Sequence, residues 1–372
     1  MRVAGIMSGT SLDGIDIAIV DIRGRRVSTL AFRSNHYPKR VREALPLICN
    51  TLAHTASISR MNFLLGELYA EALIDTARRA KIPLDSIELI GMHGQTIFHE
   101  GSPIDYLDRR VASTLQIGEP AVVAERTGIR VISNFRERDI AAGGQGAPLI
   151  PFVDQLLFRD PRRKRIALNI GGIANITILP PARSRAPVIA FDTGPGNMII
   201  DALVEHHTRG KSRFDRGGRI AGRGQIDHRL LGSLLGNPYF TLPPPKSCGR
   251  EEFAGVFAIK LIARKIPMTT LIATATEFTA QSIALAIRNY AKGAGEVIAS
   301  GGGVHNRQIM LRLRALLPSC AISTSADFGI DPDAKEAIAF AILAREHARG
   351  RPANLPSATG ARRAAILGKS SP

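Results

Sequence analysis

Tryptophan is absent from this sequence of 372 residues, and tyrosine occurs only five times. Proteins that stack nucleic-acid bases need exposed aromatic rings, so this composition argues against a stacking platform. The three cysteines, Cys49, Cys248 and Cys320, stand far apart and form no CxxC pair. This spacing excludes a disulfide framework and a cysteine-based zinc site, and we expect reduced thiols.

Long apolar runs are also missing. A helix that crosses a bilayer needs about 18 or more consecutive apolar residues, and the sequence contains no such stretch. Residues 1–20 also lack the basic start and the small-residue cleavage site of a secretory signal. We therefore expect a soluble, cytoplasmic protein that has no membrane partner.

Acidic residues are too few to balance the basic ones, and the formal net charge is +17. Clustered Lys and Arg would indicate nucleic-acid binding, because they neutralise phosphates. Here the basic residues are dispersed, and the densest run, residues 162–165, has no aromatic residues between the charges. We predict no nucleic-acid partner and a basic surface that attracts small anions.

The hydrophobic pattern predicts two blocks in which strands and helices alternate. Short apolar runs predict strands at 2–7, 15–22 and 27–32, and apolar residues three and four apart predict a helix over 61–80. Further strands are expected at 87–92, 130–133, 166–170, 173–179, 188–191 and 297–300, and further helices at 269–291 and 307–316. We predict an α/β protein of two domains, residues 1–165 and 166–372, around a central cleft.

Four glycine-rich turns carry the candidate chemistry. The first joins the first two strands and contains Gly9, Thr10, Ser11, Leu12, Asp13, Gly14, Ile15 and Asp16. Glycine reaches backbone φ angles closed to other residues, so N–H groups can approach phosphate oxygens, and Asp13 could hold a magnesium ion. An ordinary hairpin turn is the alternative. A Walker-type loop is excluded, because no GxxxxGK[ST] pattern occurs.

Two further turns are weaker signals. Gly171 and Gly172 lie between two predicted strands and could grip the other side of a phosphate chain. Gly301, Gly302 and Gly303 follow a predicted strand. They could let the backbone lie flat against a nucleotide, or they could only mark a flexible loop.

Asp192 is the candidate catalytic residue, because it follows a predicted strand and begins another glycine turn. Catalytic groups of open α/β sheets lie at such strand ends, and a carboxylate there can act as a general base. Alternatively, Asp192 only caps the next helix or orders the turn. The loop 143–146 is equally ambiguous: its glycines permit tight turns, or its Gln145 binds a sugar hydroxyl.

Other polar residues are weaker candidates. His93 and His99 have no Cys or His at ligand spacing, which argues against zinc. Glu336 lies on a predicted helix, where a solvated side chain is the simpler interpretation.

The motifs together resemble one known family, the anhydro-N-acetylmuramic acid kinases. Their order is specific, and the resemblance extends over nearly the whole chain. The similar segments are 5–16, 94–96, 141–149, 169–175, 191–197, 244–247 and 356–361. One departure is Cys248, where the family usually has threonine, so a hydroxyl contact from that position is in doubt. The resemblance also predicts that the basic C-terminal tail is ordered as far as Leu367.

The resemblance implies an actin/hexokinase-like fold, in which two ribonuclease-H-like domains bind ATP and a sugar, and a homodimer. The implied reaction converts 1,6-anhydro-N-acetylmuramate, ATP and water to N-acetylmuramate 6-phosphate and ADP, with Mg²⁺, in murein recycling. Residues 9–16 and the other glycine turns would bind ATP, and Asp192 would activate water. The sugar is expected to contact Gln95, Thr96, Arg136, Gln145 and Glu336.

Two other classes share this superfold. An ordinary amino-sugar kinase would phosphorylate a free hydroxyl and consume no water. A nucleotide-gated binding protein or chaperone would keep the glycine turns but leave Asp192 without a role.

Overall fold

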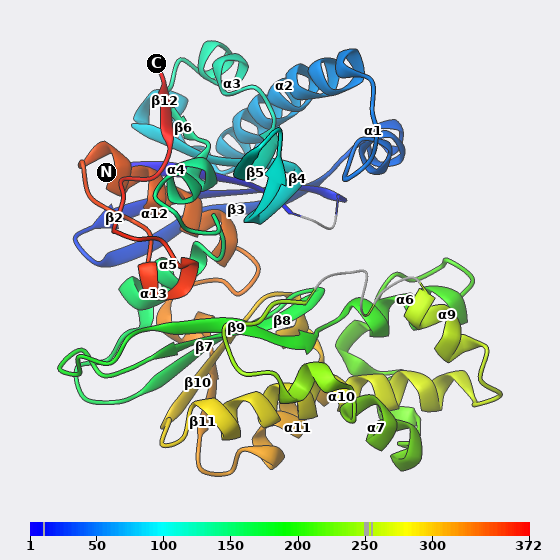
Figure 1. Ribbon diagram of the computed structural model, residues 1–372. Helices are drawn as coiled ribbons and strands as arrows, with labels where there is room; N and C mark the ends of the chain where they lie inside the picture. The colour runs from blue at the N-terminus through cyan, green and yellow to red at the C-terminus, as the bar shows by residue number, and fades with distance from the viewer. Residues whose placement is uncertain (10–11, 249–252, 254–255) are drawn as a thin grey trace. The chain divides into compact units, whose positions relative to one another are not determined.

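Figure 1 shows the computed structural model, which describes residues 1–9, 12–248, 253 and 256–372. The chain forms two compact units, residues 1–157 with 329–372, and residues 158–328. The expected division at residue 165 is close to this boundary. The expected domain 166–372 differs, however, because residues 329–372 belong to the first unit.

Helix α12 (Lys335–Ala348) explains why the C-terminal segment joins the first unit. It packs on the strands β1 (Arg2–Ser8) and β4 (Leu89–Tyr106). Glycines make this approach possible: a β-carbon at Gly5 would lie 1.8 Å from the Ala337 carbonyl oxygen, and one at Gly91 would lie 2.0 Å from that of Phe340. The helix backbone therefore contacts the sheet directly.

The sheet of the first unit has the order β12-β6-β4-β1-β2-β3, and β5 pairs with β4 outside this path. The strands β1, β2 and β3 are antiparallel neighbours, whereas β4 is parallel to β1 and β6 is parallel to β4. The remaining bounds are β2 Gly14–Arg23, β3 Arg26–His36, β5 Arg109–Ile117, β6 Val131–Ser133 and β12 Lys369–Ser371.

The hairpin of β4 and β5 is the main departure from the predicted strands. A strand was expected only at 87–92, but β4 continues to Tyr106 and β5 follows it. The pairing contains two register shifts, between Thr96 and Phe98 and between Glu100 and Ile104. Such bulges interrupt the alternation of apolar and polar residues, so the period of two is lost.

Helices α2 (Thr55–Arg79) and α3 (Pro120–Thr127) bury apolar side chains on one face of this sheet. Leu65, Tyr69 and Leu73 of α2 share a core with Ile6 and Ile17. The α2 helix begins six residues before the predicted start at 61, where the His54 ring accepts a hydrogen bond from the Ala56 N–H. The other helices are α1 Lys39–Ala44, α4 Phe135–Ala141, α5 Ile150–Phe158 and α13 Pro356–Thr359.

The second unit repeats the strand order of the first. Its sheet, β11-β10-β7-β8-β9, corresponds to β6-β4-β1-β2-β3, with the same parallel and antiparallel pairs. The bounds are β7 Arg165–Ile170, β8 Ile173–Leu179, β9 Ile189–Pro195, β10 Glu296–Ser300 and β11 Ala321–Thr324. This repeated topology confirms the predicted α/β fold with two ribonuclease-H-like units.

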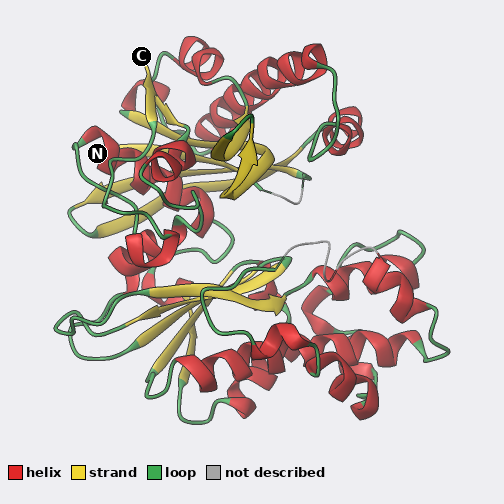
Figure 2. Cartoon of the chain, in the orientation of Figure 1, coloured by secondary structure: helices red, strands yellow, loops and turns green. Residues whose placement is uncertain are grey.

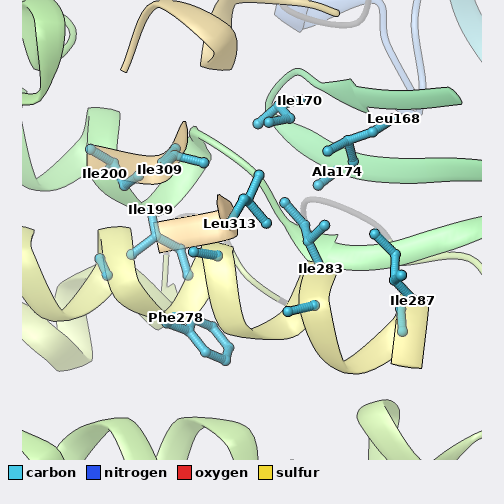
Figure 3. Close-up of a cluster of buried hydrophobic side chains, with 14 of the residues drawn as sticks. Leu168, Ile170, Ala174, Ile199, Ile200, Phe278, Ile283, Ile287, Ile309 and Leu313 are labelled. Atoms are coloured by element: carbon cyan, nitrogen blue, oxygen red, sulfur yellow. The ribbon is translucent and has the colours of Figure 1, made fainter. Parts of the chain in front are cut away.

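Helix α10 (Met268–Tyr290) forms the centre of the second core. Figure 3 shows Phe278, Ile283 and Ile287 of α10 gathered with Leu168 and Ala174 of the sheet. In the described part of the chain, α10 alone is long and apolar enough to cross a membrane, but 83% of its apolar window is buried within the protein. Further helices of this unit are α6 Met198–His207, α7 His228–Leu235, α9 Val256–Ile262 and α11 Arg307–Leu316. Figure 1 labels them, and Figure 2 draws all helices in red in the same orientation.

Candidate active site

The first glycine turn connects β1 to β2, as predicted. Two of its predicted phosphate ligands, Thr10 and Ser11, lie outside the described residues. The Leu12 N–H donates to the Gly9 carbonyl at 3.3 Å, and the Tyr37 N–H donates to the Asp13 carbonyl at 3.0 Å. These bonds hold the turn at both sides.

Gly14 is required for a reason other than the expected φ angle. Its φ lies outside the left-handed region, whereas Leu12 has a φ of 60°. A β-carbon at Gly14 would lie 2.4 Å from the carbonyl oxygen of Asn35 on β3. Close strand packing, rather than a special backbone angle, therefore selects glycine at this position.

Gln95 is fully buried and braces the turn. Its Oε1 accepts a hydrogen bond from the Ser8 hydroxyl at 2.6 Å, and its Nε2 donates to the Gly9 carbonyl at 3.1 Å. The Ser8 hydroxyl also lies 2.5 Å from the Tyr37 hydroxyl. The sugar contact expected of Gln95 stays a prediction, and in the structure its amide binds Ser8 and Gly9 of the first glycine turn.

Four carboxylates gather beside the first turn. Burial raises the pKa of Asp16 to about 6, a hydrogen bond from Ser34 opposes this shift, and the negative charges of Glu336, Asp13 and Asp333 add to it. Glu336 is half-buried. Its influence on Asp16 places it beside the turn, rather than on the solvated helix face that the simpler interpretation assumed.

This charge pattern fits a cation. No group of three or more His, Cys, Asp or Glu side chains in the described residues could hold a metal ion by themselves. Mg²⁺ in kinases needs only one or two carboxylates, because waters and substrate phosphates complete its shell. Asp13 is exposed next to Asp16, so these two residues suit a phosphate-bound Mg²⁺.

The raised pKa of Asp16 predicts a pH-dependent stability. Below about pH 4 Asp16 is protonated in both the native and the unfolded state, so it does not reduce the free energy of unfolding there. Above about pH 6 the native state must hold a disfavoured charge, so stability is lost as pH rises through 6. We expect the free energy of unfolding of Asp16→Asn, relative to wild type, to rise by about 2–3 kcal/mol between pH 4 and 7. Urea denaturation at four pH values measures this difference, and Asp85→Asn, which changes an exposed carboxylate, is the control. If the free energy of unfolding of both variants changes equally with pH, the raised pKa of Asp16 is contradicted.

His93 connects the turn to Arg136. The Arg136 Nε–H donates to His93 Nε2 at 3.1 Å, so the His93 proton is on Nδ1, which donates to the Ser8 carbonyl at 3.2 Å. Burial, helped by the charge of Arg136, lowers the pKa of His93 to about 3, which keeps the ring neutral. Sequence analysis considered His93 only as a zinc ligand and missed this structural role.

Arg136 also reaches the loop that carries Gln145. Its NH1 donates to the Gly146 carbonyl at 2.8 Å. Burial lowers the pKa of Arg136 to about 10, and the negative charge of Glu336 is the largest effect that opposes this shift. Arg136 and Glu336, both expected at the sugar, therefore lie near each other in the first unit.

Asp139 holds the Gln145 loop in place. This fully buried carboxylate accepts hydrogen bonds from the Gly146 N–H at 2.8 Å, the Asn354 side chain at 2.7 Å and the Thr359 hydroxyl at 2.8 Å. The Gln145 N–H donates to the Thr359 carbonyl at 2.8 Å. The C-terminal segment thus supports the loop, and its predicted order is confirmed beyond Leu367, since β12 pairs with β6.

The remaining glycine turns meet within the second unit, at the end of β7. The Gly196 N–H donates to the Gly172 carbonyl and the Asn197 N–H donates to that of Gly171, both at 2.8 Å. A β-carbon at Gly301 would lie 2.7 Å from Asn169 Oδ1. The turn at Gly301 is therefore tightly packed rather than a loose loop. Gly171 and Gly172 occupy the position in β7–β8 that the first turn occupies in β1–β2.

Asp192 lies in this group of turns, on β9 opposite Asn175. It is half-buried, its N–H donates to the Lys246 carbonyl at 3.1 Å, and its Oδ2 accepts a hydrogen bond from the Cys248 N–H at 3.1 Å. It does not cap the following helix, because α6 begins at Met198 with Asn197 as its N-cap. The alternative that Asp192 caps the following helix is therefore wrong. Hydrogen bonds with the backbone of Lys246 and Cys248 hold Asp192 in place.

Residue 248 is cysteine here, whereas the resemblance led us to expect threonine, and the hydrogen bond from its backbone shows what this difference affects. The observed contact to Asp192 uses the N–H of residue 248, which any residue except proline supplies. Tyr239, which lies beside Lys246, was not expected at the site, and Lys246 was expected only as part of the segment 244–247. Lys246 Nζ lies 4.6 Å from the Tyr239 ring centre, and burial lowers the pKa of this lysine.

Two ribonuclease-H-like units, each with a turn between its first two strands, define the class of this protein: an ATPase of the actin/hexokinase-like superfold. The family model of anhydro-N-acetylmuramic acid kinase matches residues 1–372. The chain belongs to the anhydro-N-acetylmuramic acid kinase family, and it is therefore a carbohydrate kinase.

Relatives of that name are similar over their full length. The protein from Caldanaerobacter subterraneus subsp. tengcongensis is 43% identical over 384 residues, covering 99% of this chain and 96% of its own. The protein from Bacillus cereus strain Q1 is 42% identical over 388 residues, covering 99% and 98%. Among solved structures, the ROK family glucokinase from Streptomyces griseus, in complex with glucose and AMPPNP, has a TM-score of 0.41 and 12% identity, covering 93% of this chain and 100% of that chain.

Proposed function

We propose that this protein opens the 1,6-anhydro ring of anhydro-N-acetylmuramate with water and transfers the γ-phosphoryl group of ATP to O6. The products are N-acetylmuramate 6-phosphate and ADP. The observation that best supports this reaction is the placement of Asp192, whose carboxylate is held among the glycine turns by the Cys248 N–H. A carboxylate held in this way can act as the base that takes a proton from the attacking water.

In the proposed reaction, two bonds form and two bonds break, apart from the proton transfer. Asp192 takes a proton from a water molecule as the water oxygen bonds to C1 of the sugar, and the bond between C1 and O6 breaks. The released O6 bonds to the γ-phosphorus, and the bond between that phosphorus and the β–γ bridging oxygen breaks to release ADP. The backbone bonds to residue 192 orient the carboxylate before the water arrives.

We assign the nucleotide to the glycine turns. Residues 9–16 and the pair Gly171 and Gly172 would bind the phosphates, because they are equivalent turns of the two repeats. Gly301, Gly302 and Gly303 would adjoin the nucleotide; a β-carbon at Gly302 would meet nothing within 4 Å in the structure, which leaves its backbone approachable. Mg²⁺, held by Asp13, would neutralise phosphate charge in the transfer.

We assign the sugar to Thr96, Arg136, Gln145 and Glu336, with Gln95 acting through the phosphate turn. The hydrogen bonds that Arg136 donates to His93 and to the Gln145 loop support this grouping. By the same family resemblance, we propose a homodimer in the cytoplasm that acts in murein recycling.

The reaction in H₂¹⁸O tests this proposal. With anhydro-N-acetylmuramate and ATP, mass spectrometry should find one ¹⁸O atom at the anomeric hydroxyl of the phosphorylated product. Unlabelled N-acetylmuramate 6-phosphate in the same solvent is the control for slow exchange. An ordinary amino-sugar kinase would instead phosphorylate N-acetylmuramate and leave the anhydro sugar unchanged, and that result would overturn the proposal.

A further inference from the structure

Gln116 is a buried residue for which the proposed reaction has no role so far. It lies on β5 directly opposite Thr96 on β4 and is only 9% exposed. Its Nε2 donates to the Thr114 hydroxyl at 2.7 Å and to the Thr96 hydroxyl at 3.3 Å. Its Oε1 is buried, and within the described residues it has no hydrogen-bond partner.

The neighbouring hydroxyl determines which way the amide faces. The single proton of the Thr114 hydroxyl has two acceptors besides Gln116, the Phe98 carbonyl at 3.3 Å and an unprotonated His99 Nδ1 at 3.0 Å, so the hydroxyl oxygen accepts from Gln116 Nε2 at 2.7 Å. The NH₂ group must therefore point at Thr114, and the oxygen points away from it. A buried amide oxygen without a partner is unfavourable, and native proteins rarely keep one unless a ligand or water satisfies it.

The side chain of Gln116 lies on the same sheet face as Thr96, one of the residues assigned to the sugar. The next residue, Ile117, is part of the core beneath α2, and successive side chains of a strand point to opposite faces. Gln116 therefore faces away from that core, together with Thr96 and Thr114. The same β4–β5 hairpin supports the Gln145 loop, since a β-carbon at Gly101 would lie 2.4 Å from the Gln145 carbonyl oxygen.

A second contact ties this face to Arg136. The His99 ring nitrogen Nδ1 lies 3.0 Å from the Thr114 hydroxyl. Partial burial lowers the pKa of His99, and the positive charge of Arg136 lowers it further. Helix α4, which carries Arg136, packs against β5. Gln116 thus neighbours Thr96, and its strand packs against the helix that carries Arg136.

We propose that the amide oxygen of Gln116 accepts a hydrogen bond from the sugar, and that Gln116 is a further specificity-determining residue. The ligand must present a donor, which the acetamido N–H or a ring hydroxyl can supply. This inference rests on the proposed function, because it takes the anhydro amino sugar as the ligand. An unpaired acceptor penalises any sugar that lacks a donor at this point, so it selects among sugars.

The Gln116→Met variant tests the inference, because methionine has a similar length and no hydrogen-bonding amide. We expect the KM for anhydro-N-acetylmuramate to rise about 10-fold or more, with the KM for ATP unchanged. The melting temperature should change little, because the variant also removes an unpaired buried oxygen. Ser113→Ala on the same strand is the matched control and should leave both KM values unchanged.

A substrate analogue separates the two possible donors. The analogue carries an acetate ester in place of the acetamido group, so it keeps the carbonyl but lacks the N–H. If the N–H is the donor, wild type and Gln116→Met should bind the analogue equally; if a hydroxyl is the donor, the difference should persist.

Other outcomes would overturn the inference. An unchanged sugar KM in Gln116→Met, or a fall in melting temperature with both KM values altered together, would make Gln116 a structural residue only. Failure of the proposed function is distinct, because wild type would then form no labelled product from the anhydro sugar. Isothermal titration of the sugar to both proteins gives the affinity without turnover.

Discussion

Replacing Asp192 with Asn should lower kcat by about 10²- to 10⁴-fold and leave ATP affinity nearly unchanged. Asparagine has the same shape, and its oxygen can still accept the hydrogen bond from the Cys248 N–H. It cannot take a proton from water. The turn should therefore keep its structure while the chemical step fails.

Steady-state kinetics and titration of ATP measure the two effects separately. Glu205→Gln is a suitable control, because it removes an exposed carboxylate from α6 in the same unit. A wild-type kcat in Asp192→Asn would mean that another group activates the water. If ATP affinity and kcat were both lost, Asp192 would instead be a structural residue that orders the glycine turns.

Replacing Lys335 with Met should reduce the free energy of unfolding by about 3–5 kcal/mol. Lys335 Nζ lies 3.0 Å from Asp154 Oδ1, and the two side chains are only 2% and 4% exposed. The pair joins the first residue of α12 to α5 inside the first unit. Removing the lysine leaves a buried carboxylate without this charge partner, which costs more than the pair itself contributes.

The double variant Lys335→Met with Asp154→Leu should recover most of this loss, because no buried charge remains. Urea denaturation of both variants measures the recovery. Lys39→Met is the control, since its ion pair with Glu43 is exposed and should contribute less than about 1 kcal/mol. A single variant as stable as this control would show that water or another group compensates Asp154.

Much of the candidate site could be predicted, because each part depends on a few adjacent residues. The turns after β1 and β7 follow from glycines between apolar runs. Asp192 was expected just after a strand, whereas β9 continues past it to Pro195. The contacts of Gln95, His93 and Gln116 could not be predicted, because their partners lie on other strands. Spacing along a chain does not encode which polar groups meet across a sheet.

The sequence by itself determined the local elements of this protein. The strand at 173–179 and the helix at 307–316 match their predicted bounds, because apolar periodicity depends on neighbours a few residues apart. Only the tertiary structure decided that residues 329–372 complete the first unit and that Glu336 lies beside the first glycine turn. Both outcomes result from α12 packing onto Gly5 and Gly91, a contact between segments far apart in the chain.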